Sequence, residues 1–162
     1  MDETSSILLS GRSEACEAAK TLILAASQRV YIYSQRLESD LYNDVEIYNH
    51  LSQLASENRK SDFRIIAHDT RVAANRGHYL IHLAQKLPSF AQIRTTVTPA
   101  QRQFKESWLL VDDGALLRLR NLERYEGYYE LDNKLENRSY TAEFLEAWEA
   151  CQGDQNTRRL SL

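Results

Sequence analysis

The sequence predicts an α/β fold: a mixed, mainly parallel sheet with an antiparallel hairpin edge and helices on both faces. Amphipathic helical segments alternate with short apolar runs over much of the chain. Strands separated by helices need crossover connections, so the first three strands are expected to be parallel. The dipeptide Asp113-Gly114 between two apolar runs is typical of a two-residue hairpin.

Each predicted helix carries apolar residues at helical spacing on one face. Ser13 and Asp44 are expected to cap the first two helices, because their side-chain oxygens can accept from free backbone N–H groups. Pro88 ends the third, since proline lacks the N–H that a helix interior needs. The helices are predicted at residues 13–27, 44–58, 69–87 and 139–151.

The predicted strands are compact runs of apolar, β-branched and aromatic residues. Phe63–Ala67 is almost continuously apolar, which is typical of a strand covered on both faces. Residues 125–131 are expected to add a further edge strand beside the hairpin. The other strands are predicted at residues 29–34, 63–67, 91–97, 108–111 and 115–120.

Composition limits the class of protein. The 162 residues suit one domain, expected at residues 7–151 with flexible tails at 1–6 and 152–162. Hydrophobic residues make up 43%, enough for a core, and no apolar run has the length of a membrane span. Cys16 and Cys151 match no metal or redox spacing, so we expect reduced thiols in a cytoplasmic protein. We predict neither a metal site nor a cofactor.

The segment from Lys105 to Gly114 carries the most specific motif. It begins with polar residues, continues as a buried strand and ends in the Asp-Gly turn. The spacing of Lys105, Ser107 and Asp112 matches the H-x-K-x4-D signature of phospholipase-D-like phosphoesterases, with Asp112 in the aspartate position. By this motif and its order of elements, the chain resembles one phospholipase-D-like half. It is also similar to an uncharacterised family of proteobacterial domains of unknown function.

The resemblance implies a pocket without the family's catalytic residues. In that family a histidine attacks phosphorus, and a protein with one signature completes its site by dimerising. Here Lys105 occupies the histidine position and Ser107 the lysine position. A lysine amine accepts a phosphoryl group only if its pKa is strongly depressed, and serine lacks charge. We therefore predict no catalytic residue and a non-catalytic module that binds a phosphate-containing ligand or a protein partner.

A candidate anion site follows the predicted strand 63–67. In open α/β sheets, ligands bind beyond the carboxyl ends of parallel strands, where His68 and Arg71 lie in the sequence. Two interpretations stay open: an anion site, or a helix cap with solvated arginines. The predicted ligand-binding residues are His68, Arg71, Arg76, His78, Lys105 and Ser107.

Arginine and tyrosine alternate around the returning strand of the hairpin. Such residues suit stacking on bases with phosphate pairing, a protein interface, or a charged edge strand that resists aggregation. The net charge of −3 favours the interface over broad nucleic-acid binding. The candidate interface residues are Arg118, Arg120, Arg124, Tyr125 and Tyr128.

Two other functions remain alternatives. One is a phosphodiesterase or nuclease that acts as a homodimer and uses His68 or His78 as a relocated nucleophile or base. The other is an oligomeric scaffold whose edge of arginine and tyrosine is the interface. The expected partners are thus a phosphate-containing ligand or nucleic acid, and a second copy or a protein partner, but no membrane.

Overall fold

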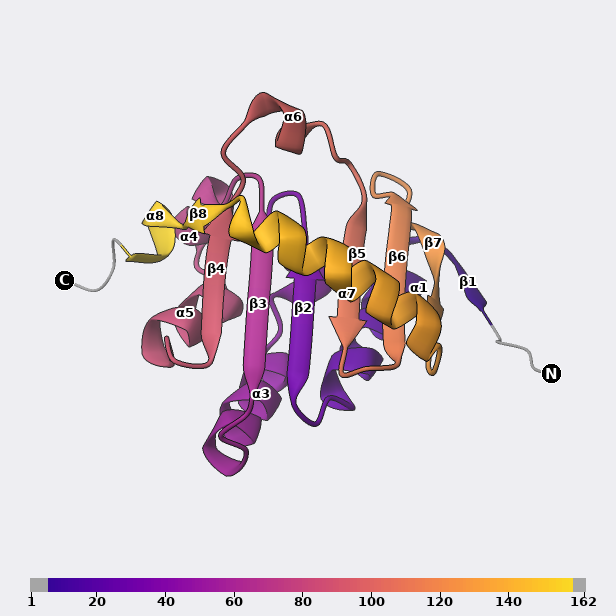
Figure 1. The fold of residues 1–162 in the computed structure, drawn as a ribbon, viewed down its shortest axis with the longest axis horizontal. Helices are drawn as coiled ribbons and strands as arrows, with labels where there is room; N and C mark the ends of the chain where they lie inside the picture. Colours follow the sequence, from indigo (N-terminus) through magenta and orange to yellow (C-terminus); the bar gives the residue numbers. More distant parts are fainter. Residues whose placement is uncertain (1–5, 159–162) are drawn as a thin grey trace.

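A mixed sheet separates two helical layers in the computed structural model, which describes residues 6–158 (Figure 1). Its strands are β1 (Ile7–Ser10), β2 (Arg29–Tyr33), β3 (Asp62–Ala67), β4 (Ala91–Thr95), β5 (Ser107–Val111), β6 (Ala115–Asn121), β7 (Glu126–Glu130) and β8 (Gln152–Gly153). The helices are α1 (Arg12–Leu24), α2 (Ser39–Tyr42), α3 (Val45–Glu57), α4 (Arg71–Arg76), α5 (Tyr79–Lys86), α6 (Pro99–Arg102), α7 (Lys134–Glu149) and α8 (Gln155–Arg158).

The strand order is β1-β7-β6-β5-β2-β3-β4-β8. Strands β2, β3 and β4 are parallel and β5–β6 is an antiparallel hairpin, as the sequence predicts. The expectation of a mainly parallel sheet is wrong, because every other pair is antiparallel. The hairpin is also not an edge: β5 pairs with β2, and β7 and β1 extend the sheet beyond β6. Strand β1 was not predicted, because its four residues are too few to show a period.

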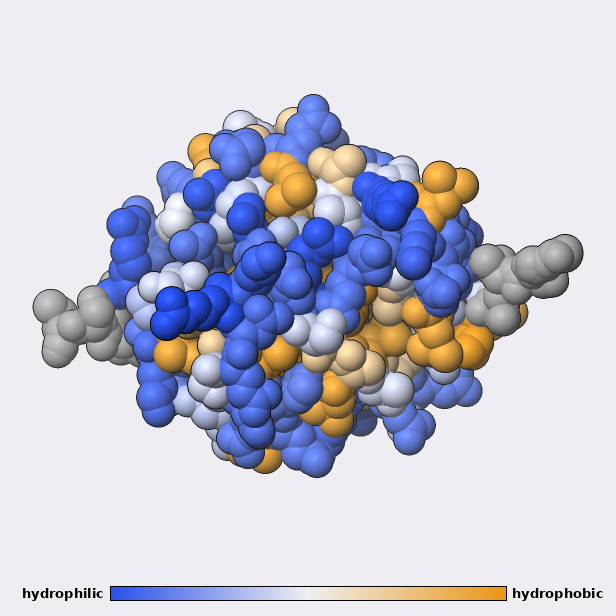
Figure 2. Space-filling model, turned by 60° about the horizontal axis from the view of Figure 1, so that its bottom comes forward, coloured by the Kyte–Doolittle hydropathy of each residue, from blue (hydrophilic) through white to orange (hydrophobic). Residues whose placement is uncertain are grey.

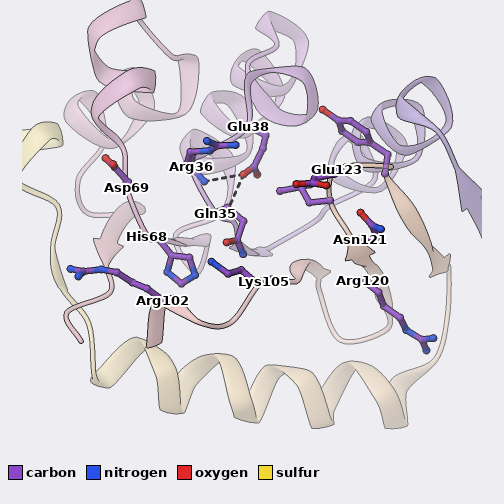
Figure 3. Close-up of a pocket in the computed structure, with 12 residues that line it drawn as sticks. Gln35, Arg36, Glu38, His68, Asp69, Arg102, Lys105, Arg120, Asn121 and Glu123 are labelled. Carbon is purple, nitrogen blue, oxygen red and sulfur yellow. Dashed lines mark hydrogen bonds between the residues drawn. The ribbon is translucent and has the colours of Figure 1, made fainter. Parts of the chain in front are cut away.

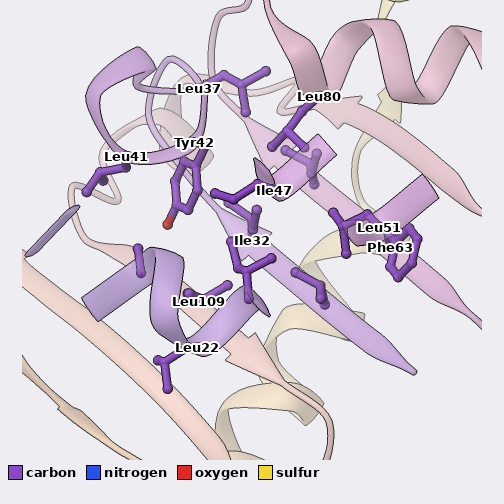
Figure 4. Close-up of a cluster of buried hydrophobic side chains, with 14 of the residues drawn as sticks. Leu22, Ile32, Leu37, Leu41, Tyr42, Ile47, Leu51, Phe63, Leu80 and Leu109 are labelled. Carbon is purple, nitrogen blue, oxygen red and sulfur yellow. The ribbon is translucent and has the colours of Figure 1, made fainter. Parts of the chain in front are cut away.

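Alternation along β2 builds a core on each face of the sheet. Val30 and Ile32 point into the larger core, formed with α1, α3 and α5 (Figure 4). Tyr31 and Tyr33 point to the other face, which α7 covers with Phe144. The ring of Tyr31 stacks on that of Phe144 at a centroid distance of 4.8 Å. Both faces of β2 are therefore buried.

The predicted helix 69–87 is two helices in the structure. Gly77 has φ +86, a left-handed conformation that glycine adopts without steric cost, and it ends α4. His78 then caps α5, because its Nδ1 accepts a hydrogen bond from the Leu80 N–H at 3.1 Å. The predicted cap at Asp44 is confirmed, whereas Ser13 lies inside α1 and Gly11 precedes that helix. Helix α7 begins at Lys134, earlier than predicted.

The C-terminal segment is part of the fold. A flexible tail from residue 152 is wrong for residues 152–158, because β8 pairs with β4 and buried Asp154 accepts a hydrogen bond from Thr70 Oγ1 at 2.7 Å. Ser6, also assigned to a tail, donates to Glu130. The remaining tail residues, 1–5 and 159–162, lie outside the described part of the chain. Within residues 6–158, no helix is both long enough and apolar enough to cross a membrane.

Asp112 joins the β5–β6 turn to the loop before β2. Its carboxylate accepts hydrogen bonds at 3.0 Å from the backbone N–H groups of Ser27, Gln28 and Arg29. Asp112 has φ +52, a left-handed conformation that aspartate and asparagine tolerate better than most residues. The one residue that matches the signature is thus a structural anchor at the opposite end of β5 from Lys105.

We predict that Asp112→Ala lowers the free energy of unfolding by about 2–3 kcal/mol, because three backbone donors lose a charged acceptor. Asp112→Asn should lose less, since asparagine keeps one acceptor oxygen and tolerates the same φ. Asp113→Ala, at the exposed neighbouring position, is the control and should stay within about 0.5 kcal/mol of wild type. Urea denaturation measures all three, and equal stability of the two alanine variants would contradict the assignment.

Candidate functional site

An open pocket lies where β2 and β3 end and β5 begins (Figure 3). Its volume is about 820 Å³. The loop after β2 contributes Gln35 and Arg36, and the loop after β3 contributes His68. Lys105 comes from the chain before β5, and Arg120 from the end of β6. Because β5 runs antiparallel to β2, it starts at the edge where β2 and β3 end, so polar side chains from four strands meet there.

Four cationic side chains line the pocket: Arg36, Arg102, Lys105 and Arg120. None of them has a carboxylate within 4.0 Å among the residues that the structure describes. Arg102 donates one long hydrogen bond, of 3.4 Å, to the Thr96 carbonyl. The pocket therefore offers several cationic N–H donors that the fold does not use.

The acidic residues of the pocket are partly engaged. Oε2 of Glu38 accepts hydrogen bonds from the backbone N–H groups of Gln35 and Arg36, at 3.2 and 2.9 Å. Asp69 pairs with Arg71 at 2.8 Å, and this hydrogen-bonded guanidinium lowers the pKa of the Asp69 carboxyl. Glu123 also lines the pocket, so three acidic side chains accompany the four cationic ones, and one of the three, Asp69, is already paired with Arg71.

His68 holds the loop that carries α6. Its Nε2 lies 2.8 Å from the Phe104 carbonyl oxygen, an acceptor only, so Nε2 carries the proton. Nδ1 is then free to accept from the Thr96 hydroxyl at 2.9 Å. Burial lowers the pKa of His68, and the charges of Lys105 and Arg102 act in the same direction. His68 is thus a neutral positioning residue with both ring nitrogens engaged.

Gln35 supports the same loop from β2. Its Nε2 donates to the carbonyl oxygens of Phe104 at 3.1 Å and Glu106 at 2.9 Å. The backbone on both sides of Lys105 is therefore held by one side chain. Figure 3 shows the Lys105 amine directed toward the His68 ring.

The two substituted signature positions differ in their surroundings. Lys105 is exposed and lines the pocket. Ser107 is completely buried, and its Oγ donates to the Tyr33 carbonyl at 3.1 Å. It does not line the pocket. The predicted contribution of Ser107 to a ligand site therefore has no geometric support, because its hydroxyl is buried and bonded to a backbone carbonyl.

The other predicted ligand residues lie apart from the pocket. Arg71 is exposed and paired with Asp69 at its rim. Arg76 is exposed at the end of α4, and His78 is buried at the start of α5. Of the six predicted ligand residues, His68 and Lys105 line this pocket, and the other four lie outside its lining.

Two candidate interface residues have partners within the chain. Arg118 donates to both carboxylate oxygens of Glu106, at 2.7 and 2.8 Å, and its guanidinium lies 5.6 Å from the Tyr140 ring centroid. Hydrogen bonding to Arg118 lowers the pKa of Glu106. The Tyr128 hydroxyl donates to Glu136 at 3.0 Å. The Arg118–Glu106 contact joins β6 to the start of β5, and the Tyr128–Glu136 contact joins β7 to α7.

The other three interface candidates surround the pocket mouth or face solvent. Arg120 and Tyr125 line the pocket, and the Tyr125 hydroxyl donates to Asp40 at 3.0 Å. The Arg120 guanidinium lies 5.6 Å from the Tyr128 ring centroid. Arg124 is exposed in the β6–β7 turn. An interface at this edge stays a prediction.

Eight residues that line the pocket were not among the predicted site residues: Gln35, Arg36, Glu38, Asp69, Arg102, Asn121, Leu122 and Glu123. Arg36 follows a predicted strand at the expected edge, so its position was available as a signal. Arg102 lies in a loop whose path depends on His68 and Gln35. Asn121 depends on the pairing of β6. Within the described residues, no group of three or more His, Cys, Asp or Glu side chains is placed to hold a metal ion.

Comparison with known families covers almost the whole chain. The profile described as "Domain of unknown function (DUF7931)" matches residues 11–160. The chain belongs to the DUF7931 family. No curated protein matches the sequence significantly.

Solved structures show which fold the DUF7931 domain has. NucT from Helicobacter pylori superposes with a TM-score of 0.64 at 14% identity, covering 94% of this chain and 100% of that one. Nuc from Salmonella typhimurium, a phospholipase D family member, gives 0.64 at 11% identity over 93% and 99%. TrmBL2, an archaeal chromatin protein with a described mode of DNA binding, gives 0.66 at 13% identity. The alignment covers 94% of this chain but 56% of TrmBL2. The DUF7931 domain therefore has a phospholipase-D-like fold.

We predict that His78 makes the stability of the DUF7931 domain depend on pH. Burial lowers its pKa from 6.5 to about 4. Between these values the unfolded chain binds a proton that the folded protein does not, so stability falls as the pH decreases through this window. His78→Asn keeps a side-chain acceptor at the cap but cannot titrate. The difference in unfolding free energy between wild type and variant should change by roughly 2–3 kcal/mol between pH 7 and pH 4.

Chemical denaturation at a series of pH values measures this difference. His82→Asn, at an exposed position of the same helix, is the matched control for the substitution itself. A constant difference between wild type and His78→Asn across the window would refute the assignment.

Proposed function

We propose that this domain is a non-catalytic phospholipase-D-like module that binds a phosphate-containing ligand in the pocket beside Lys105. The observation that carries the proposal is the group of four cationic side chains, none with an ion-pair partner among the described residues. Guanidinium and ammonium groups are the side chains that bind phosphate most strongly. At about 820 Å³, the pocket lies within the range of small-molecule sites, about 300–1,000 Å³.

The same geometry supports binding without turnover. Phosphodiester cleavage by the phospholipase-D-like mechanism needs a nucleophile and a proton donor beside the phosphorus. Lys105 replaces the signature histidine, Ser107 is buried, and both nitrogens of His68 are engaged with Thr96 and Phe104. His78 is buried at a helix cap outside the pocket. The relocated-histidine enzyme therefore has less support than a binding module.

Nucleic acid is the ligand class that we favour. The open pocket lets a polymer enter with one phosphate among the cations while the chain continues on either side. TrmBL2, which shares the fold, is described as binding DNA.

A protein partner, an oligomeric scaffold at the arginine and tyrosine edge, and a cytoplasmic location all stay predictions. Both cysteines are free thiols, which agrees with a reducing compartment.

We predict saturable binding of a fluorescein-labelled, mixed-sequence single-stranded oligonucleotide at low salt. The double variant Arg102→Gln/Lys105→Gln should bind at least roughly tenfold more weakly, because two charge-assisted contacts are lost. The slope of log K against log salt should shrink by about 1.4, at about 0.7 per phosphate contact of a single strand. Fluorescence anisotropy at several salt concentrations measures both quantities.

Arg76→Gln is the matched control for this titration. It removes an exposed arginine outside the pocket and should leave affinity within about twofold of wild type. Equal losses in the control and the pocket variant would refute the pocket. The recovered oligonucleotide is then run on a denaturing gel, where it should be intact. Cleavage that disappears in His68→Gln would instead establish the enzyme alternative.

A further inference from the structure

A second cationic feature lies on the α7 side of the sheet, away from the pocket. Arg29, Arg64 and Arg94 occupy β2, β3 and β4, one on each strand. Arg64 pairs with Tyr31, two residues beyond Arg29, and Arg94 pairs with Ile66, two residues beyond Arg64. The three arginines therefore form a diagonal line, which we call the arginine row. Helix α7 crosses the same face in the same diagonal sense (Figure 1).

Aromatic rings hold the guanidinium groups of the row. Arg29 and Arg64 lie over the Tyr31 ring, at 5.3 and 5.7 Å from its centroid. Arg64 and Arg94 lie over the Trp148 ring, at 5.4 and 4.4 Å. Tyr31 is 4% exposed and Trp148 is 2% exposed, so both rings are fixed in the core. The row is thus partly ordered before any partner arrives, which reduces the entropy cost of binding.

Among the three arginines of the row, only Arg64 has an ion-pair partner within residues 6–158. Arg64 pairs with Asp62 at 3.0 Å. Arg29 donates to the Asp112 carbonyl at 2.6 Å, and Arg94 donates to the Trp148 carbonyl at 2.8 Å. Neither Arg29 nor Arg94 has a carboxylate within 4.0 Å among residues 6–158. A guanidinium has five N–H donors, and Arg29 and Arg94 each use one of them in these bonds, while the Nε of Arg29 is buried without a partner.

Charge complementarity requires an anionic partner, and the surroundings favour carboxylates over a nucleic acid. Binding of single strands relies on exposed aromatic rings on which bases stack. Here the rings of Tyr31 and Trp148 are buried under the arginines.

The spacing of the row suits an extended peptide. Successive arginines are separated by one strand spacing and two residues along the strand, which corresponds to about 8 Å between their Cα atoms. Alternate side chains of an extended peptide lie about 7 Å apart. Flexible arginine side chains can make up the difference of about 1 Å between the two spacings. Figure 2, which brings the N-terminal ends of β2, β3 and β4 forward, shows a mainly hydrophilic surface with small hydrophobic groups.

We propose that the arginine row binds an extended acidic segment of a partner protein, with carboxylates at alternate positions. Each carboxylate would accept paired hydrogen bonds from a guanidinium of the row. This site lies on a different face from the pocket beside Lys105, so its existence does not depend on the proposed phosphate ligand. The domain would then hold a protein partner and a phosphate-containing ligand at separate surfaces.

The test uses the full chain and a fluorescein-labelled peptide of alternating glutamate and threonine. Anisotropy should rise saturably at low salt, and the same peptide with glutamine in place of glutamate should not bind up to about 1 mM. Arg94→Gln should weaken binding roughly tenfold, and Arg94→Lys should weaken it less, because lysine keeps the charge but loses the fork of donors. Lys86→Gln, on the exposed side of α5, is the matched control and should bind as wild type does.

Each outcome decides for or against the row. Circular dichroism first establishes that the variants fold, and Arg29→Gln replaces Arg94→Gln if the latter does not. Equal affinity for the two peptides, or unchanged affinity in the folded row variant, would overturn the proposal. Oligonucleotide binding that depends on Arg94 while the acidic peptide fails to bind would also overturn it. Retained peptide binding in Arg102→Gln/Lys105→Gln would separate the row from the pocket.

Discussion

The position of β2 between a parallel and an antiparallel neighbour determines the rest of this structure. Its pairing with β3 brings the loops that carry Gln35 and His68 to one edge, and its pairing with β5 starts the Lys105 segment at that same edge. Burial of both faces of β2 makes the register unambiguous, since a shift of one residue would exchange the two cores. The pocket and the arginine row are both consequences of this arrangement.

Much of the fold follows from patterns that are local in the sequence. The apolar runs identified all three parallel strands, and Asp113-Gly114 identified the hairpin. The mainly antiparallel pairing of the sheet could not be predicted in this way, because the pairings of β5 with β2 and of β1 with β7 join segments distant in the chain. The structured C-terminal segment was also missed, since its contacts with β4 and Thr70 leave no periodic signal.

The sequence predicted the edge of the sheet at which the candidate site lies, but not most of the residues that line it. Lys105 and His68 were found because one lies in a motif and the other follows a strand. His78 and Arg76 were included on the assumption of one continuous helix, which Gly77 interrupts. The signature segment now divides by role: Asp112 anchors a loop, Ser107 packs in the sheet, and Lys105 alone reaches the pocket. Four cationic side chains thus line a pocket of a phospholipase-D-like fold, and one of them is Lys105.

NMR mapping shows whether the pocket beside Lys105 binds a phosphate group without cleaving it. Amide chemical shifts of the ¹⁵N-labelled full chain are followed while inorganic pyrophosphate is added. We expect saturable shifts concentrated at Gln35, His68 and Lys105, with the phosphorus spectrum of pyrophosphate showing no hydrolysis. Shifts that fail to saturate, that concentrate away from these residues, or that accompany conversion of pyrophosphate to phosphate would contradict it.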